Sequence, residues 1–123
     1  MIQNILLVGI GGFIGSAARY GTGKFIQSVF DTQLPFATFT VNIIGSFIIG
    51  LVLALFEKNM IITPNLKLLI AVGFCGGFTT FSSFAFENLS ALQNGQFLTA
   101  AIYTSLSLLF GLSAVYGGFM LGK

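Results

Sequence analysis

Hydrophobic residues run in four long stretches along the chain, and short polar segments separate them. The stretches cover about residues 5–25, 36–56, 64–93 and 96–121. A helix needs about 20 predominantly apolar residues to cross the roughly 30 Å hydrocarbon core of a bilayer. Each stretch reaches that length. The pattern predicts an all-α membrane protein with four transmembrane helices, organised as one membrane domain over residues 1–123.

The composition agrees with this pattern and excludes several classes of protein. Only 7% of the residues are charged and 55% are hydrophobic, whereas a soluble domain carries about 25% charged residues. The five Lys and Arg residues are scattered and form no basic patch for nucleic acid. Without histidine and with one cysteine, Cys75, the chain offers no disulfide and no His/Cys metal site. We therefore expect no enzyme.

The ends of the stretches carry helix-start signals. Pro35 precedes the second stretch, and Thr63-Pro64 reads as an N-cap followed by proline at the first helical position. The first stretch has no basic segment before it, and its apolar run extends beyond the core of a typical signal peptide. We expect it to be a retained membrane span.

The charges are divided almost evenly between the two sides of the membrane. Four spans place both termini and the 57–65 loop on one side. That side carries Lys58, Lys67 and Lys123, and the other side carries Arg19 and Lys24. This difference gives almost no positive-inside bias. Two arrangements are open: a single, weakly specified orientation, and a dual topology in which copies insert both ways and pair antiparallel.

The third stretch contains an unusual run, Gly-Gly-Phe-Thr-Thr, over residues 76–80. Glycine and β-branched threonine are poor helix formers. Counted from Pro64 at about 1.5 Å per residue, residues 76–79 fall near the middle of the bilayer. We predict that the third helix is broken there. The carbonyls freed by such a break are tolerated inside protein or beside a cavity, and in transporters they bind cations such as Na⁺.

Small and polar residues recur at helical spacing within the spans. The 16 glycines, Gly11 and Gly15 among them, predict close helix packing. Polar groups inside a bilayer are costly unless they are paired or face water. Two such series occur, Thr38, Asn42 and Ser46 in the second stretch and Tyr103, Ser107 and Gly111 in the fourth. Either interhelical hydrogen bonds or the wall of an aqueous path would explain them.

Several polar and aromatic residues are expected in the membrane half opposite the termini. Phe81 and Phe84 share a helix face, where they either pack and meet lipid or turn their positive ring edges toward an anion. Arg19 is either a structural anchor or an attractor of anions. Glu87 is a proton-coupling carboxylate, a partner of Arg19, or a helix-end residue near water. The same half is expected to hold Asn42, Tyr103 and Ser107.

Taken together, these residues resemble the Fluc-type (CrcB) fluoride channel family over essentially the whole chain. Three motifs carry the resemblance, and the third is the most specific. They are Gly11-Gly12-Phe13-Ile14-Gly15 followed by Arg19-Tyr20, then Thr38-Phe39-Thr40-Val41-Asn42-Ile43-Ile44-Gly45-Ser46-Phe47, and Gly73-Phe74-Cys75-Gly76-Gly77-Phe78-Thr79-Thr80-Phe81-Ser82-Ser83-Phe84.

The resemblance implies a fluoride-selective channel that passively exports fluoride from the cytoplasm, in the inner (plasma) membrane of a prokaryote. It also implies an antiparallel, dual-topology homodimer with two fluoride pathways. A central structural sodium ion, on the two-fold axis of the dimer, would be held by the backbone carbonyls of Gly76 and Thr79. The implied partners are fluoride, the second copy of the chain and the lipid bilayer.

The same resemblance implies a set of site residues. Phe81 and Phe84 would line the pores, with the Asn42 side chain near the ion. The polar track would be formed by Ser83, Tyr103 and Ser107. The vestibule would be formed by Arg19 and Glu87. Ser83 departs from the family pattern, in which threonine is commoner. Beyond Ser107 the track reads Gly111 and Ser113.

Two other classes of protein remain open. A proton-coupled small multidrug-type transporter is also a four-span antiparallel dimer. It would normally have a carboxylate in the first span and an aromatic cage, whereas this first span carries Arg19 and the chain has no Trp. A structural or assembly subunit is the other class, and it would leave the Gly-Gly-Phe-Thr-Thr run unexplained.

Overall fold

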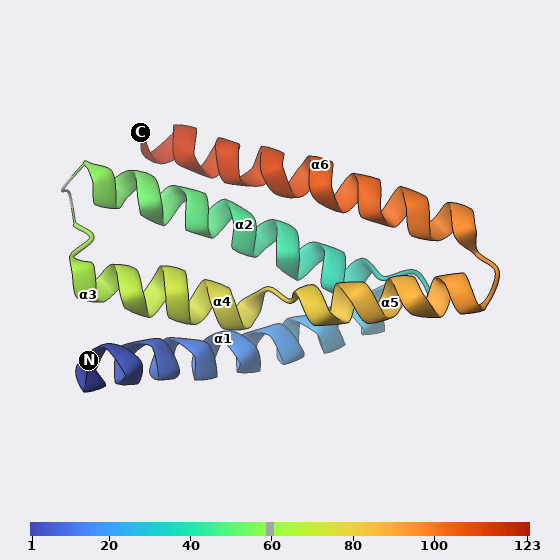
Figure 1. Ribbon diagram of the computed structural model, residues 1–123, viewed down its shortest axis with the longest axis horizontal. Coiled ribbons are helices and arrows are strands. Elements are labelled where there is room, and N and C mark those ends of the chain that lie inside the picture. The colour runs from blue at the N-terminus through green and yellow to red at the C-terminus, as the bar shows by residue number, and fades with distance from the viewer. Residues whose placement is uncertain (59–60) are drawn as a thin grey trace.

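The computed structural model describes residues 1–58 and 61–123, and it is built from helices (Figure 1). The first, second and fourth spans are α1 (Ile2–Val29), α2 (Phe36–Glu57) and α6 (Phe97–Gly122). The third span is divided into α3 (Pro64–Lys67), η1 (Leu68–Cys75), α4 (Gly76–Phe78) and α5 (Phe81–Gln93). In the described part of the chain, four spans are long and apolar enough to cross a membrane. The chain is therefore a multi-pass membrane protein, as predicted.

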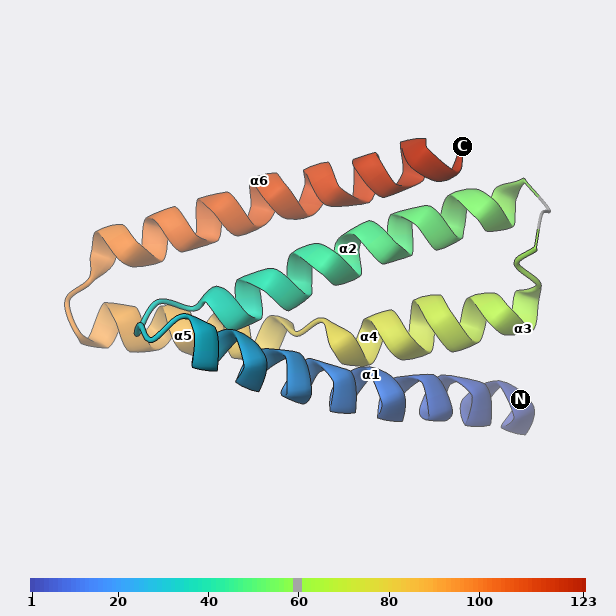
Figure 2. The same cartoon turned by 180° about the vertical axis from the view of Figure 1, so that it is seen from behind.

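Both termini lie at the same end of the molecule, together with the end of α2 and the start of α3 (Figures 1 and 2). The α1–α2 and α5–α6 connections lie at the opposite end. The closest helix partners are α2 with α6, and α1 with η1 and α4. This arrangement agrees with an even number of spans. Residues 59–60 of the predicted 57–65 loop lie outside the described residues.

The helix starts follow local capping chemistry. Thr63 is the N-cap of α3, its hydroxyl accepts a hydrogen bond from the Leu66 N–H at 3.1 Å, and Pro64 occupies the first helical position, as predicted. Pro35 is the N-cap of α2 rather than its first residue. The helix α1 continues to Val29, four residues past the predicted end at 25.

Glycines bring the helices together backbone to backbone. A Cβ atom on Gly11 or Gly15 would overlap the carbonyl oxygens of Leu69 and Phe74 in the third span. On the other side of the molecule, a Cβ on Gly118 of α6 would overlap a carbonyl oxygen of α2. The predicted glycine-mediated packing is confirmed at these positions.

The third span is broken at Thr79 and Thr80, both of which have extended backbone. The predicted break is therefore correct, but it lies at the threonine pair, and Gly76 and Gly77 remain helical in α4. Threonine is β-branched and tolerates extended backbone well. Gly77 has a packing role, since a Cβ there would meet the backbone of Gly12 in α1. The preceding segment η1 has wide π-helical turns, which nothing in the sequence predicted.

Candidate functional site

The break in the third span is held on one side by Asn42 of α2. The side-chain oxygen of Asn42 accepts a hydrogen bond from the Thr80 N–H at 2.8 Å, and its Nδ2 donates to the Thr80 carbonyl at 3.1 Å. Thr80 in turn caps α5, because its hydroxyl accepts a hydrogen bond from the Ser83 N–H at 3.2 Å. One side chain therefore satisfies both backbone groups of the residue at which the helix restarts.

Arg19 of α1 contacts the break from the other side. Its Nε donates a hydrogen bond to the Gly77 carbonyl at 3.0 Å. In a continuous α-helix that carbonyl would accept from the N–H of residue 81. Of the two roles left open for Arg19, the contact supports the structural anchor.

The break also changes the backbone partners of the Gly76 and Thr79 carbonyls. In a continuous helix the Gly76 carbonyl would pair with the Thr80 N–H, and the Thr79 carbonyl with the Ser83 N–H. The Thr80 N–H donates to Asn42 and the Ser83 N–H donates to the Thr80 hydroxyl. The carbonyls of Gly76 and Thr79 have thus lost their usual helical donors, which fits a group that binds cations through backbone oxygen. The described residues contain no cluster of three or more His, Cys, Asp or Glu that could hold a metal.

Glu87 of α5 lies between two hydroxyl donors from neighbouring helices. The Thr38 hydroxyl donates to one carboxylate oxygen at 2.7 Å, and the Tyr103 hydroxyl donates to the other at 2.7 Å. Among the described residues no ion pair joins Glu87 to Arg19. Each bond crosses between helices, so this carboxylate ties α5 to α2 and α6.

The predicted pore phenylalanines form a row with Tyr103. The ring centroids of Phe81 and Phe84 are 5.7 Å apart, and those of Phe84 and Tyr103 are 5.0 Å apart. Tyr103 is buried and Phe84 is half-buried, whereas Phe81 is 78% exposed. The row therefore leads from the interior of the helix bundle to its surface.

Polar, aromatic and aliphatic side chains, Ile49, Val72 and Leu108 among the last, line a cavity of about 510 Å³ beside the break. The Ser107 hydroxyl in this wall is buried and has no hydrogen-bond partner among the described residues. The predicted site residues that the cavity brings together are Asn42, Gly76, Thr79, Phe81, Phe84 and Ser107.

A second cavity, of about 250 Å³, is lined by the remaining charged candidates, and Thr80 lines both this cavity and the first. Its lining includes Arg19, Ser83 and Glu87 as well as Lys24. Glu87 also lines a larger cavity of about 720 Å³ together with Tyr103 and the loop residues 31–34. The two predicted vestibule residues therefore share one cavity, and Glu87 also reaches the larger one.

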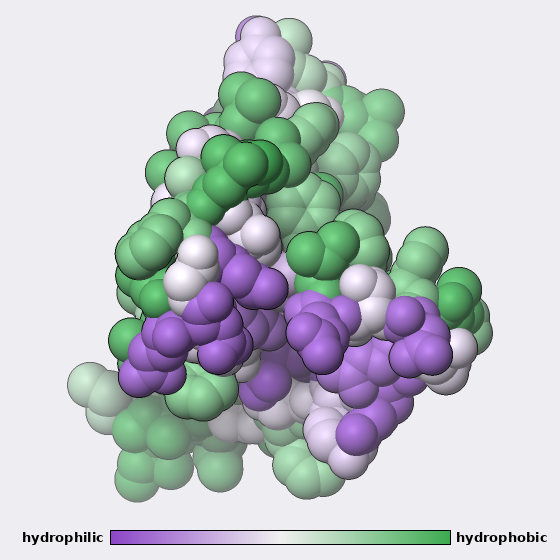
Figure 3. Space-filling view, turned by 90° about the vertical axis from the view of Figure 1, so that its right-hand side faces the viewer, coloured by the Kyte–Doolittle hydropathy of each residue, from purple (hydrophilic) through white to green (hydrophobic). Residues whose placement is uncertain are grey.

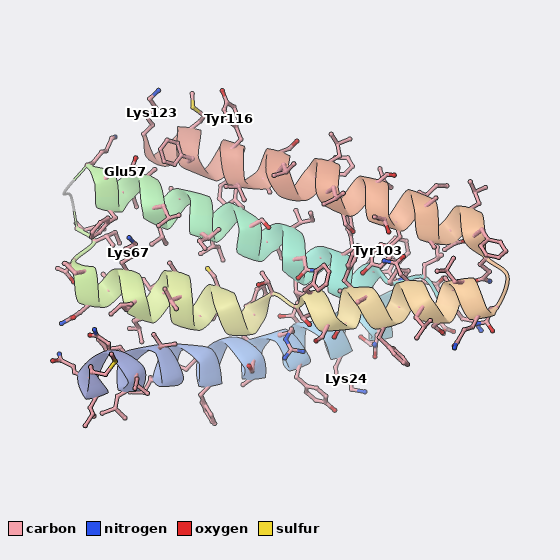
Figure 4. The ribbon with its side chains drawn as sticks, in the orientation of Figure 1. Lys24, Glu57, Lys67, Tyr103, Tyr116 and Lys123 are labelled. Atoms are coloured by element: carbon pink, nitrogen blue, oxygen red, sulfur yellow. The ribbon has the colours of Figure 1, made fainter. Side chains whose placement is uncertain are left out.

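The two cavities that Glu87 lines lie in the half of the molecule away from the termini, whereas the cavity beside the break crosses the middle and reaches Ile49, Ala71 and Val72. Hydrophilic residues gather at the end away from the termini, which faces the viewer in Figure 3, and the cavity of about 720 Å³ is lined there by residues such as Gln27, Asp31 and Asn94. Tyr103 and Lys24 lie in this half, whereas Glu57 and Lys123 lie at the other end (Figure 4). The expected grouping of the polar residues in one half is confirmed.

Two residues of the site were missing from the predicted set. The sequence places Thr38 only on a polar helix face, although its hydroxyl donates a hydrogen bond to the Glu87 carboxylate. Thr80 was read only as a helix breaker, although it is both the partner of Asn42 and the cap of α5. The available signal for the cap was the threonine itself, a preferred N-cap residue directly before the helix restarts at Phe81.

Comparison with known proteins identifies the family. The model of the family described as "CrcB-like protein, Camphor Resistance (CrcB)" matches residues 6–119. A protein of Gloeothece citriformis named "Fluoride-specific ion channel FluC" is 52% identical over 119 residues, which cover 97% of this chain and 96% of the relative. Relatives of the same name from Chlorobium phaeobacteroides and Chlorobaculum tepidum are 48% and 42% identical and cover 99% and 100% of this chain, and 94% and 97% of their own length. The resemblance seen in the sequence is confirmed: the chain belongs to the CrcB-like family.

Proposed function

We propose that this chain is a fluoride-selective ion channel that lets fluoride leave the cytoplasm passively. The observation that carries the proposal is the cavity beside the break, which neutral donors and phenylalanine rings line in a chain 52% identical to a protein named a fluoride-specific ion channel. Passive flow needs no catalytic group. The proposed location is the inner membrane of a prokaryote.

The lining chemistry suits a small, strongly hydrated anion. A pore must replace the water around fluoride with hydrogen-bond donors, and the Ser107 hydroxyl is buried without a partner in the described residues. Asn42 uses one amide N–H on Thr80 and retains a second. The ring edges of Phe81 and Phe84 add weak positive potential. Several modest sites of this kind let an ion enter and also leave.

An antiparallel pair of chains would complete the path. Glu87 and its hydroxyl donors Thr38 and Tyr103 lie in a single half of the molecule, so a copy inserted the other way would supply the same groups to the opposite half. Phe81 is 78% exposed and would meet the partner. The near-even division of the cations supports insertion in both orientations. Two pathways per homodimer follow from the two-fold symmetry. Cysteine accessibility from each side of the membrane should find both orientations, and a single orientation would contradict the dimer.

The carbonyls of Gly76 and Thr79 would hold a structural sodium ion. Both have lost their helical donors, and a Cβ on Gly76 would meet no atom within 4 Å. When bound, sodium would supply a positive charge between the two copies and stabilise their contact. Replacement of Na⁺ by a large organic cation should therefore lower the thermal stability of the dimer, and an unchanged stability would remove this part of the proposal.

Anion efflux from proteoliposomes tests the proposed function. Vesicles loaded with fluoride and chloride are followed with electrodes for both ions. The wild-type chain should release fluoride and retain chloride. Equal release of both ions, or no release of fluoride, would refute a fluoride channel. Transport of an organic cation driven by a proton gradient would instead favour the small multidrug-type transporter.

A further inference from the structure

We infer that Arg19 is a positioning residue that keeps the third span broken and thereby directs the Gly76 and Thr79 carbonyls toward a cation. The evidence for the broken conformation is independent of any ion, and only the cation itself rests on the proposed function. The one contact that joins Arg19 to the break is the 3.0 Å bond from its Nε to the Gly77 carbonyl.

The bond favours the broken conformation over a continuous helix. In a continuous helix the Gly77 carbonyl would receive the N–H of Phe81, and a second donor would add little. At the break the guanidinium supplies the donor, and hydrogen bonds from a charged group are stronger than neutral ones. A contact present in only one of two conformations shifts the equilibrium toward that conformation. Asn42 acts in the same direction on Thr80, so two helices hold the break from opposite sides.

Helix packing brings Arg19 within reach of the break. A Cβ on Gly77 would meet the backbone of Gly12 and the Ser16 hydroxyl, so α1 and α4 pack at backbone distance there. Gly12, Ser16 and Arg19 are spaced by four and three residues and therefore follow one face of α1. The side chain that follows this contact along the helix is the one that bonds Gly77.

Lys24 provides a matched comparison within the same cavity. Both cations line the cavity of about 250 Å³. The Lys24 ammonium lies 5.4 Å from the ring centroid of Tyr20, a residue of its own helix, whereas Arg19 reaches across to the break. If a positive charge in the cavity were all that mattered, the two residues would be equivalent. If the bond to Gly77 matters, only Arg19 affects the break.

Hydrogen–deuterium exchange on the full chain in lipid nanodiscs tests the inference. Arg19→Met removes both the charge and the donor, and Arg19→Lys keeps the charge but places a methylene where arginine has its Nε–H. Without the bond to Gly77 the equilibrium moves toward the continuous helix, in which the Phe81 N–H pairs with the Gly77 carbonyl. Both variants should therefore slow exchange of the Phe81 amide by at least about tenfold, because a hydrogen bond from a charged group is lost from the broken conformation alone. Lys24→Met should leave this rate unchanged. Wild-type exchange at Phe81 in Arg19→Lys, or equal slowing in Lys24→Met, would overturn the inference.

Sodium titration separates this inference from the proposed cation site. Exchange of the Phe81 amide is measured over a range of NaCl, with a large organic cation keeping the ionic strength constant. A bound cation would favour the broken conformation, so exchange in both Arg19 variants should return toward the wild-type rate as Na⁺ rises. Variants that ignore Na⁺ would refute the sodium site, while the comparison of Arg19 with Lys24 without Na⁺ would still decide the role of Arg19.

Discussion

In the half of the molecule that holds both termini, the helices touch backbone to backbone, whereas in the other half polar side chains and cavities separate them. In the first half Gly11 and Gly15 of α1 lie against the third span, and Val52, Ile62 and Ala71 form an apolar core. In the second half α5 is linked to α2 and α6 through Glu87, and cavities lie on either side of Thr80.

The difference shows how one helix serves two purposes. On the side that faces α1, the first part of the third span is fixed by close glycine contacts. The break then releases α5 from that packing, and its backbone and side-chain groups become available to other partners. Rigidity in one half therefore positions the chemistry of the other.

The largest effect on stability is expected from a side chain at a packed glycine. Gly15→Leu must displace the backbone of Phe74, and overpacking costs about 1–3 kcal/mol or more when the backbone has to move. The variant should lose assembly on size-exclusion chromatography. Gly21→Leu is the matched control, since a Cβ at Gly21 of the same helix would meet no atom within 4 Å. Equal behaviour of the two variants would contradict the packed half.

The next largest effect is expected at Asn42. Asn42→Ala leaves the N–H and carbonyl of Thr80 without their partner, at about 1–3 kcal/mol for each buried unsatisfied group. The free energy of unfolding in mixed micelles should fall by that amount, and fluoride efflux should be lost. Ser46→Ala, one turn along the same helix face, should change the stability little. A stable Asn42→Ala would show that the break does not depend on this side chain.

A smaller effect is expected from the hydroxyl donors to Glu87. Thr38→Val and Tyr103→Phe each remove one hydrogen bond to the carboxylate, and each should cost about 1.5–3 kcal/mol. A double-mutant cycle should give a coupling energy clearly different from zero, because the two donors share one acceptor group. Thr40→Val controls for the loss of a hydroxyl from α2. Strictly additive effects would mean that the two bonds act independently.

The spans and the existence of the break could be predicted because they depend on hydropathy and local backbone preference. The exact position of the break could not be predicted. Gly77 stays helical because α1 packs against it at backbone distance, and the extended backbone lies at Thr79 and Thr80. The partners of Glu87 depend on how α2 and α6 are rotated about their axes. That rotation is set by long-range packing, which one-dimensional spacing does not specify.

The bond from Arg19 to Gly77 has the same origin as these missed partners. Spacing placed Arg19 in the correct half of the membrane and left its role open. Only the packing of Gly77 against Gly12 brings the guanidinium to the break. Phe84 and Ser107, which the family resemblance predicted for the pore, line the cavity beside the break, whereas the partners of residues that bond a neighbouring backbone could not be predicted from spacing.

The smallest effect on assembly and a large effect on flux are expected from the exposed phenylalanines of the polar half. Phe81 and Phe13 are matched in exposure, at 78% and 77%, but they lie in different halves. Phe81→Ile and Phe84→Ile should leave the proposed dimer intact. They should remove the ring edges that face the proposed path, which Phe13→Ile should not do.

Fluoride efflux from proteoliposomes containing Phe81→Ile or Phe13→Ile is the most direct test of the claim that ions pass through the polar half. With equal amounts of assembled protein, Phe81→Ile should slow fluoride release by at least about tenfold, which corresponds to about 1.4 kcal/mol in the barrier, while Phe13→Ile should match the wild type. Wild-type release from Phe81→Ile, or equal slowing by both substitutions, would contradict the claim.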